Sequence, residues 1–263
     1  MTHHSMRELR LATALVEAAD TLTESFEATD HLRRVADHCV ELLAARAAGI
    51  MLIDGGRAVS MSGSSRQEAV VLDLLAAQHG GGPCLESYGS GRPVPPVSIR
   101  AAHAEARWPD FTERALGHGI AGTFAVPLRR GGTALGALNV FLPAPPDGSS
   151  PDGSSPGGES GLPVAQLLAD AAAVGVQNHR TFTQYRSLTE QLQEALSSRV
   201  RIEQAKGMLA ERWNIEPDEA FATLRQYARR RRLPVNRVAQ AVIERVADDE
   251  LRREGPGGSG ESS

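Results

Sequence analysis

The chain has 263 residues, of which 41% are hydrophobic and 23% are charged, and its formal net charge is −4. This length and composition predict a soluble protein of two modest domains. No apolar run approaches the roughly 20 residues of a membrane span, and the stretch MTHHSMRELR lacks the apolar core of a signal peptide, so we expect a cytoplasmic protein without a membrane segment. The only two cysteines, Cys39 and Cys84, are too few for a disulfide framework and lack the spacing of a zinc site.

The charges are distributed unevenly along the chain. Between Arg199 and Arg237 the sequence holds ten cations and five acids, a local balance of +5 that leaves −9 for the rest. A local excess of cations is typical of a module that binds a polyanion, because neutralised phosphates release counterions. It is equally typical of a solvated, charged helix face, so charge alone leaves both interpretations open.

Two amphipathic helices are expected first, and Asp30 is the expected N-cap of the second. Cys39 falls on the apolar stripe of the second helix, which predicts a buried thiol. The first stripe comprises Leu9, Ala12, Val16, Ala19, Leu22 and Phe26, and the second comprises Leu32, Val35, Cys39, Leu42 and Leu43.

Antiparallel strands are expected to follow. Residues 49–63 form two strand-like runs joined through Asp54-Gly55-Gly56, and residues 119–142 form two more joined through Gly131-Gly132, which is the pattern of β-hairpins. Between them we expect a helix at 67–77, a glycine- and proline-rich connection at 80–95, a strand at 97–100 and a short helix at 108–116. Helices at the ends and antiparallel strands in the middle indicate an α+β domain over residues 1–142.

Residues 143–161 and 247–263 are expected to be disordered. The first segment repeats PDGSS and has no large apolar residue, and the second is dominated by Gly and Ser. Neither composition buries enough apolar surface to order the chain.

An uninterrupted helical pattern runs from Pro163 to Arg212. Up to about Tyr185 we expect it to pack on the sheet as the last helix of the first domain. From Ala171 onward, apolar residues recur at alternating intervals of three and four positions, with polar residues at several of these positions. We hypothesise that residues 162–196 hold the last helix of the first domain and a parallel coiled-coil linker of a dimer, with Asn178 fixing the register. The predicted seam comprises Ala171, Val174, Asn178, Thr181, Tyr185, Leu188, Leu192, Ala195, Arg199 and Ile202.

Three short helices are expected over residues 197–246. Pro217, followed by two acids, marks the start of the second helix, and the third begins near Pro234. The inward residues are expected to be Ala220, Phe221, Leu224, Tyr227 and Ala228 on the second helix and Val235, Val238, Ala239, Val242, Ile243 and Val246 on the third.

Gly207 and Lys206 are unusual in this region. Glycine inside a helix costs about 1 kcal/mol relative to alanine, and Lys206 is the only lysine against 27 arginines. We expect Gly207, with Ala205, to lie beneath another helix or against the backbone of a ligand. Chance survival of one lysine in an arginine-biased chain is the alternative for Lys206.

The C-terminal module resembles a known domain. Residues 197–244, SSRVRIEQAKGMLAERWNIEPDEAFATLRQYARRRRLPVNRVAQAVIE, resemble the ANTAR domain, the RNA-binding module of bacterial transcription antitermination regulators. GPCLESYGSGRPV (82–94), RWPDF (107–111) and AVPLRRGGTALGALNVF (125–141) resemble a GAF domain. Together about 230 residues resemble the two-domain GAF-ANTAR proteins; the long loop at 143–161 and the four arginines at 229–232 depart from the usual pattern.

The resemblance implies a homodimer that binds paired RNA stem-loops and stabilises an antiterminator over a terminator. It implies phosphate contacts for Lys206, Arg225, Arg229, Arg230 and Arg237, and base-edge contacts for Gln204 and Asn236. For Arg231 and Arg232 a solvated loop is an equal alternative. A DNA-binding regulator with a three-helix basic domain is the alternative function.

For the first domain the resemblance implies a sensor of a small molecule or of a signalling partner, with no cofactor that the sequence identifies. Candidates for lining a pocket are Cys84, Tyr88, Trp108, His118 and Phe124. Cys84 is an exposed thiol, a residue near the pocket mouth or a structural turn residue. A haem would have only His79, His103 or His118 as an axial ligand. The sequence has no metal-ligand spacing and no G-x-S-x-G motif, so we expect no enzyme and no metal site; a GAF-fold reductase acting through Cys84 is the rival interpretation.

Overall fold

The computed structural model describes residues 3–21, 27–143 and 161–245. The predicted disordered segments therefore lie almost entirely outside the described residues. The chain divides into two compact units, Met1–Phe182 and Thr183–Ser263, and the division falls inside the predicted linker segment 162–196. Among the described helices, none combines the length and the apolar composition needed to cross a membrane.

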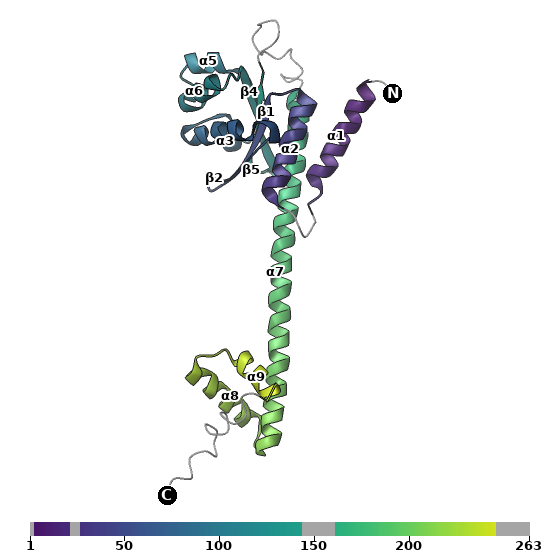
Figure 1. The fold of residues 1–263 in the computed structure, drawn as a ribbon, viewed down its shortest axis with the longest axis vertical. Helices are drawn as coiled ribbons and strands as arrows, with labels where there is room; N and C mark the ends of the chain where they lie inside the picture. The colour runs from purple at the N-terminus through teal and green to yellow at the C-terminus, as the bar shows by residue number, and fades with distance from the viewer. Residues whose placement is uncertain (1–2, 22–26, 144–160, 246–263) are drawn as a thin grey trace. The chain divides into compact units, whose positions relative to one another are not determined.

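The first unit is built on a five-stranded antiparallel sheet in the order β2-β1-β5-β4-β3 (Figure 1). β1 (Ala47–Asp54) and β2 (Arg57–Gly63) form one hairpin, and β4 (Gly122–Arg130) and β5 (Thr133–Leu142) form the other, so both predicted hairpins are confirmed. At the second turn Gly131 and Gly132 have φ of 56° and 85°, which suits glycine. β3 (Val94–Ser98) pairs only with β4 and contains two prolines, which an edge strand tolerates.

Helices cover both faces of the sheet (Figure 1). On one face lie α1 (His3–Ala19), α2 (Ala28–Leu43) and the first part of α7 (Leu162–Trp213). On the other lie α3 (Glu68–Ala76), α4 (Pro83–Ser90), α5 (Ile99–Ala104) and α6 (Pro109–Gly117), with the short 3₁₀ segments η1 (Ser65–Gln67) and η2 (Ala77–Gly80) on either side of α3. This arrangement confirms the predicted α+β fold.

Two hydrophobic cores result, one on each face of the sheet. Along β5 the side chains of Leu138 and Val140 enter the core beneath α1, α2 and α7, whereas those of Ala137 and Phe141 enter the core beneath α3 to α6. Alternation along a strand explains this division. Cys39 lies in the first core and is fully buried, as predicted.

α1 packs with a different face from the predicted one. Leu9 and Val16 are exposed, whereas Ala14 and Ala18 are buried in the core. Both faces of α1 are apolar, and the alanine face permits the closer approach: a Cβ on Gly175 of α7 would lie 2.5 Å from the carbonyl oxygen of Ala18. The predicted stripe residues Leu22 and Phe26 lie outside the described residues.

Two further predictions were wrong in detail. α2 begins at Ala28 with Glu27 as its N-cap, so Asp30 lies in the first turn instead of at the cap. The connection predicted at 80–95 contains α4, which starts with Pro83 at its first position. The glycines before α4 made this segment resemble a loop in the sequence. Gly82 has no side chain because a Cβ on it would lie 2.4 Å from Cγ of Gln78.

The second unit contains the C-terminal part of α7, α8 (Pro217–Arg231) and α9 (Val235–Ile243), as predicted. Phe221 is only partly buried and is not part of the core, which corrects its assignment as an inward residue. Val235 and Ile243, also predicted to face inward, are partly buried and pack against the core. Val246 lies outside the described residues. The buried core comprises Ala205, Leu209, Ala220, Leu224, Tyr227, Ala228, Val238, Ala239 and Val242.

Candidate nucleic-acid interface and sensor surface

Exposed arginines gather on one face of α8. Arg225 and Arg229 are four residues apart and therefore lie side by side on the helix surface, with Arg232 following at the C-cap. The Arg225 guanidinium lies 5.7 Å from the centre of the Phe221 ring, a cation-π contact that orients it. We call Arg225, Arg229 and Arg232 the arginine face.

Arg231 and Arg230 belong to other sides of α8. Arg231 lies 5.6 Å from the centre of the Tyr227 ring, which orients its guanidinium. For this residue the sequence left a solvated loop and an RNA contact as equal alternatives. Arg230 is five residues after Arg225, which places it about 140° around a helix of 3.6 residues per turn. Arg237, on α9, is exposed. The predicted phosphate contacts on α8 therefore point in more than one direction.

Gln204 and Lys206 are also separated. Residues two apart in a helix do not face each other, so one flat ligand cannot contact both side chains. Lys206 Nζ lies 2.6 Å from Oε2 of Glu203, one turn earlier. The unique lysine is thus an ion-pair partner within α7.

Asn236 faces an acidic hollow of the second unit. It is half-buried at the start of α9 and lines this hollow with α7 residues that include Glu190 and Glu194. Arg186 and Arg201 each lie 3.1 Å from one of these carboxylates. The lining of the hollow that holds Asn236 therefore includes no residue of the arginine face.

A line of large apolar side chains is exposed on the C-terminal part of α7. Tyr185, Leu188, Leu192, Leu196 and Val200 are between 50% and 67% exposed, and we call them the apolar line. The line agrees with the predicted seam up to Leu192 and then departs from it.

The apolar line departs from the predicted seam after Leu192 because later seam residues face other parts of the second unit. Ala195 lines the acidic hollow, and Ile202 packs against the helical core. Asn178, the predicted register residue, instead accepts a hydrogen bond of 2.8 Å from Nη1 of Arg130 within the first unit.

In the first unit, Cys84 is a fully buried residue of α4. Its backbone N–H donates to Oε1 of Gln78 at 2.8 Å, and burial raises the pKa of its thiol to about 12. Cys84 is therefore neither the exposed thiol nor the turn residue that the sequence suggested. Burial also raises the pKa of Cys39.

The five candidate pocket residues are not brought together. Tyr88 and Trp108 pack around the core that holds Cys84, but Phe124 is buried in the core on the opposite face of the sheet. His118 forms a 2.9 Å hydrogen bond with Asp73 of α3. Alternation along β4 turns Phe124 away from the others, which sequence proximity to the hairpin does not reveal.

Trp108 stands out by its backbone. It is the N-cap of α6 with φ 54° and ψ 60°, a left-handed conformation that is strained for a bulky residue. Its ring packs edge-on against Phe111 at 6.1 Å, and the Arg107 guanidinium lies 4.0 Å from the ring centre. Bulky side chains, among them Phe111 and Phe141, fill the core beneath it.

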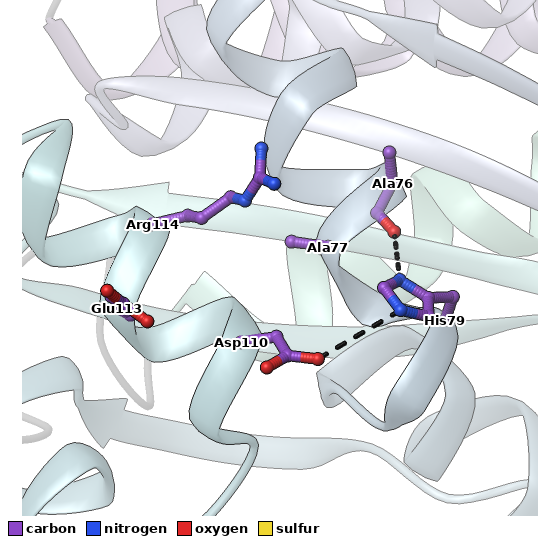
Figure 2. A pocket seen from close by; sticks show the side chains of 6 residues that line it. All are labelled: Ala76, Ala77, His79, Asp110, Glu113 and Arg114. Atoms are coloured by element: carbon purple, nitrogen blue, oxygen red, sulfur yellow. Dashed lines mark hydrogen bonds and ion pairs between the residues drawn. The ribbon is translucent and has the colours of Figure 1, made fainter.

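A hollow of about 550 Å³ opens on the surface between η2 and α6, and its lining carries charges of both signs. Figure 2 shows His79 and Asp110 turned toward each other; Nε2 of His79 lies 4.0 Å from the carboxylate. Arg114 forms an ion pair with Asp73. The hydrogen bond from His118, together with Arg114, lowers the pKa of Asp73 below its ordinary value. The lining residues are Ala76, Ala77, His79, Asp110, Glu113 and Arg114.

Family models match both units. The GAF domain model matches residues 27–177, more than half of the chain, and the ANTAR domain model matches residues 190–243. The chain is a GAF-ANTAR protein. All seven residues predicted to contact RNA fall within the ANTAR match. We call Met1–Phe182 the GAF unit and Thr183–Ser263 the ANTAR unit.

Solved structures, among them two GAF domains, resemble this chain at low identity. The GAF domain of a phosphoenolpyruvate-protein phosphotransferase from Coxiella burnetii is 16% identical with a TM-score of 0.47, and covers 70% of this chain and 99% of its own. That of A. Aeolicus nlh2 in an inactive state is 15% identical with a TM-score of 0.44, covering 65% and 98%. Free methionine-R-sulfoxide reductase from Neisseria meningitidis is 15% identical with a TM-score of 0.41, covering 68% and 95%. No curated protein matches the chain.

The three histidines considered for haem have protein partners in the GAF unit. His79 Nδ1 lies 3.0 Å from the carbonyl of Ala76, His103 Nδ1 lies 3.1 Å from Oγ1 of Thr112, and His118 bonds Asp73. In the parts of the chain that the structure describes, no three His, Cys, Asp or Glu side chains gather as metal ligands.

Sequence reasoning missed the charged hollow and the true course of the apolar line. The only signal for the hollow was RWPDF, which supplied Asp110 but not its partner His79, 31 residues earlier. The course of the apolar line depends on which residues of α7 are covered by α9, and spacing along one helix does not contain that information.

Proposed function

We propose that this GAF-ANTAR protein is a signal-responsive transcription antitermination regulator of the cytoplasm. Its ANTAR unit binds paired stem-loops in nascent RNA, and its GAF unit controls that binding. The observation that supports this proposal most directly is the arginine face of α8, a row of exposed guanidiniums on a small, rigid helical module.

Arginine chemistry fits folded RNA. A guanidinium binds a phosphate through two parallel hydrogen bonds and stacks on exposed bases, whereas an ammonium acts as a point charge. Sequence-selective RNA binding uses loops whose bases are free to stack on side chains. The ring of Phe221 holds Arg225 in position before RNA arrives, which lowers the entropic cost of binding.

The apolar line on α7 supports a homodimer. Large apolar side chains aligned on an exposed helix face suit burial against an equivalent helix. Two joined ANTAR units would hold two stem-loops at once, and linked binding events raise the overall affinity without new contacts. We therefore propose that the dimer is the form that binds RNA.

The GAF unit is proposed to bind a signal and not to catalyse a reaction. The charged hollow beside α6 suits a small polar molecule or a charged segment of a signalling partner. Thiol chemistry needs a thiolate, and burial raises the pKa of both cysteines. These observations favour a binding sensor over the reductase alternative.

A competition assay tests the proposed function. Full-length protein is incubated at physiological salt with a labelled RNA carrying two hairpins, and unlabelled hairpin RNA or duplex DNA of equal length is added. We expect hairpin RNA to displace the label at least about tenfold more effectively than duplex DNA. Equal or better displacement by duplex DNA would favour the DNA-binding alternative.

A further inference from the structure

No contact within the described residues explains why position 207 is a glycine. It is exposed, and a Cβ placed on it meets no atom within 4 Å among the residues that the structure describes. The prediction that Gly207 lies beneath another helix of the chain is therefore wrong, although Ala205 is fully buried. Gly175, the other glycine of α7, is needed internally because Ala18 approaches it.

The position of Gly207 extends the apolar line. Tyr185, Leu196 and Gly207 follow one another at intervals of 11 residues. Eleven residues complete three turns at 3.67 residues per turn, so positions 11 apart lie on one line along a nearly straight helix. Val200 lies seven residues before Gly207 on the same side. The apolar line thus leads to a position that has no side chain.

We propose that Gly207 is the point of closest approach between α7 and the α7 helix of a second copy of this chain. The proposal rests on the proposed homodimer and adds where its helices come nearest. The distance between packed helices depends on the side chains at the contact, and glycine allows the shortest one. In a parallel pair with twofold symmetry, each Gly207 faces its counterpart.

The charges around Gly207 favour a helix over RNA as the neighbour. Glu203 and Glu211 lie one turn before and one turn after Gly207 and are exposed. The Glu203 carboxylate is paired with Lys206 at 2.6 Å, so Glu211 is the acid that repels phosphates here. Arg199 lies four residues before Glu203 on the same face. In the parallel pair, Arg199 of one helix lies about one turn from Glu203 of the other, which allows an ion pair across the contact.

Gly207→Ala is the direct test. Sedimentation equilibrium of the full-length protein should show a dimer that dissociates about tenfold more readily than wild type, because the added methyl group overpacks the contact. Circular dichroism should show no loss of helix. The matched control is Gly89→Ala: Gly89 is also exposed within a helix, α4, and a Cβ there meets nothing within 4 Å. The control should stay within about twofold of wild type.

A cysteine crosslink separates this inference from the homodimer itself. Val200→Cys should form an interchain disulfide on mild oxidation if the helices pair in register, with little background because Cys39 and Cys84 are buried. If the crosslink forms and Gly207→Ala dimerises like wild type, the homodimer stands and the role of Gly207 is refuted. If Gly207→Ala dimerises normally but loses hairpin RNA, RNA is the neighbour and the inference is also refuted. A monomeric wild type without crosslink removes the homodimer and the inference together.

Discussion

At the scale of single residues, close packing at Gly175 joins α1 to α7. A Cβ at this position would lie 2.5 Å from the Ala18 carbonyl oxygen and 2.8 Å from a methyl group of Thr21. Oγ1 of Thr21 also donates a hydrogen bond of 2.8 Å to the Gly175 carbonyl. The Ala18 backbone on one side and the buried, hydrogen-bonded Thr21 side chain on the other leave no room for a methyl group on Gly175.

Gly175→Ala should therefore destabilise the GAF unit by about 2 kcal/mol, the usual cost of overpacking. Urea unfolding of the full-length protein, followed by circular dichroism, measures the change. Gly89→Ala is the control, because its methyl group meets no atom and alanine favours the helix. Unchanged stability of Gly175→Ala would show that α1 is not held against α7 in solution.

The buried His31 of α2 predicts how the stability of the fold depends on pH. Burial, and secondarily the charge of Arg34, lowers its pKa to about 4. The unfolded chain takes up this proton near pH 6.5 and the folded chain only near pH 4. Acidification across that window therefore favours unfolding, by up to about 3 kcal/mol in total.

Urea unfolding between pH 7 and pH 4 checks this prediction. Wild type should lose stability steadily on acidification, and His31→Leu should lose less across the same window. His79→Gln removes an exposed histidine and serves as the control, with a wild-type profile expected. Identical pH profiles for wild type and His31→Leu would contradict the assignment.

At the scale of elements, we propose that the arginine face makes α8 the main phosphate-binding helix. Arg225→Ala with Arg229→Ala should weaken binding to hairpin RNA at least tenfold and should lower the salt dependence of log K by about 1.4, or about 0.7 for each lost phosphate contact. The measurement is a fluorescence titration at several salt concentrations. The ANTAR unit should keep its fold, because both side chains are exposed.

The control for this double variant removes the same charge from the other unit. Arg57 and Arg66 are exposed in the GAF unit, so Arg57→Ala with Arg66→Ala should leave the affinity and the salt slope close to those of wild type. If both double variants weaken binding equally, net charge and not the face of α8 controls the affinity.

Elements were predictable where local chemistry dictates them. The turn glycines and Pro217 fix the backbone conformation at their own positions. The hairpin turns and the start of α8 can therefore be read from the sequence alone. α4 was missed because Gly82, which directly precedes it, makes room for the Gln78 side chain and does not mark a longer loop. The face of α1 was wrong because both of its faces are apolar and only its neighbours select one.

At the scale of the whole molecule, the order and type of the two domains were predictable, whereas the composition of the candidate sites was not. Arg225 and Arg229 could be placed together because helical spacing alone joins them. Phe124 could not be separated from Cys84 without knowing which face of the sheet each strand residue enters. Asn236 could not be placed in one hollow with Glu190 because that hollow is formed by α7 and α9 together.

The central proposal is that two copies of the chain present two arginine faces to one RNA. The most direct measurement is a titration of full-length protein against an RNA with two hairpins and against the same RNA with one hairpin unfolded by mutation, with the mass of each complex determined by light scattering. We expect two chains on the two-hairpin RNA and an affinity at least about tenfold higher than for the one-hairpin RNA. One chain per RNA, or equal affinity for both RNAs, would contradict the account.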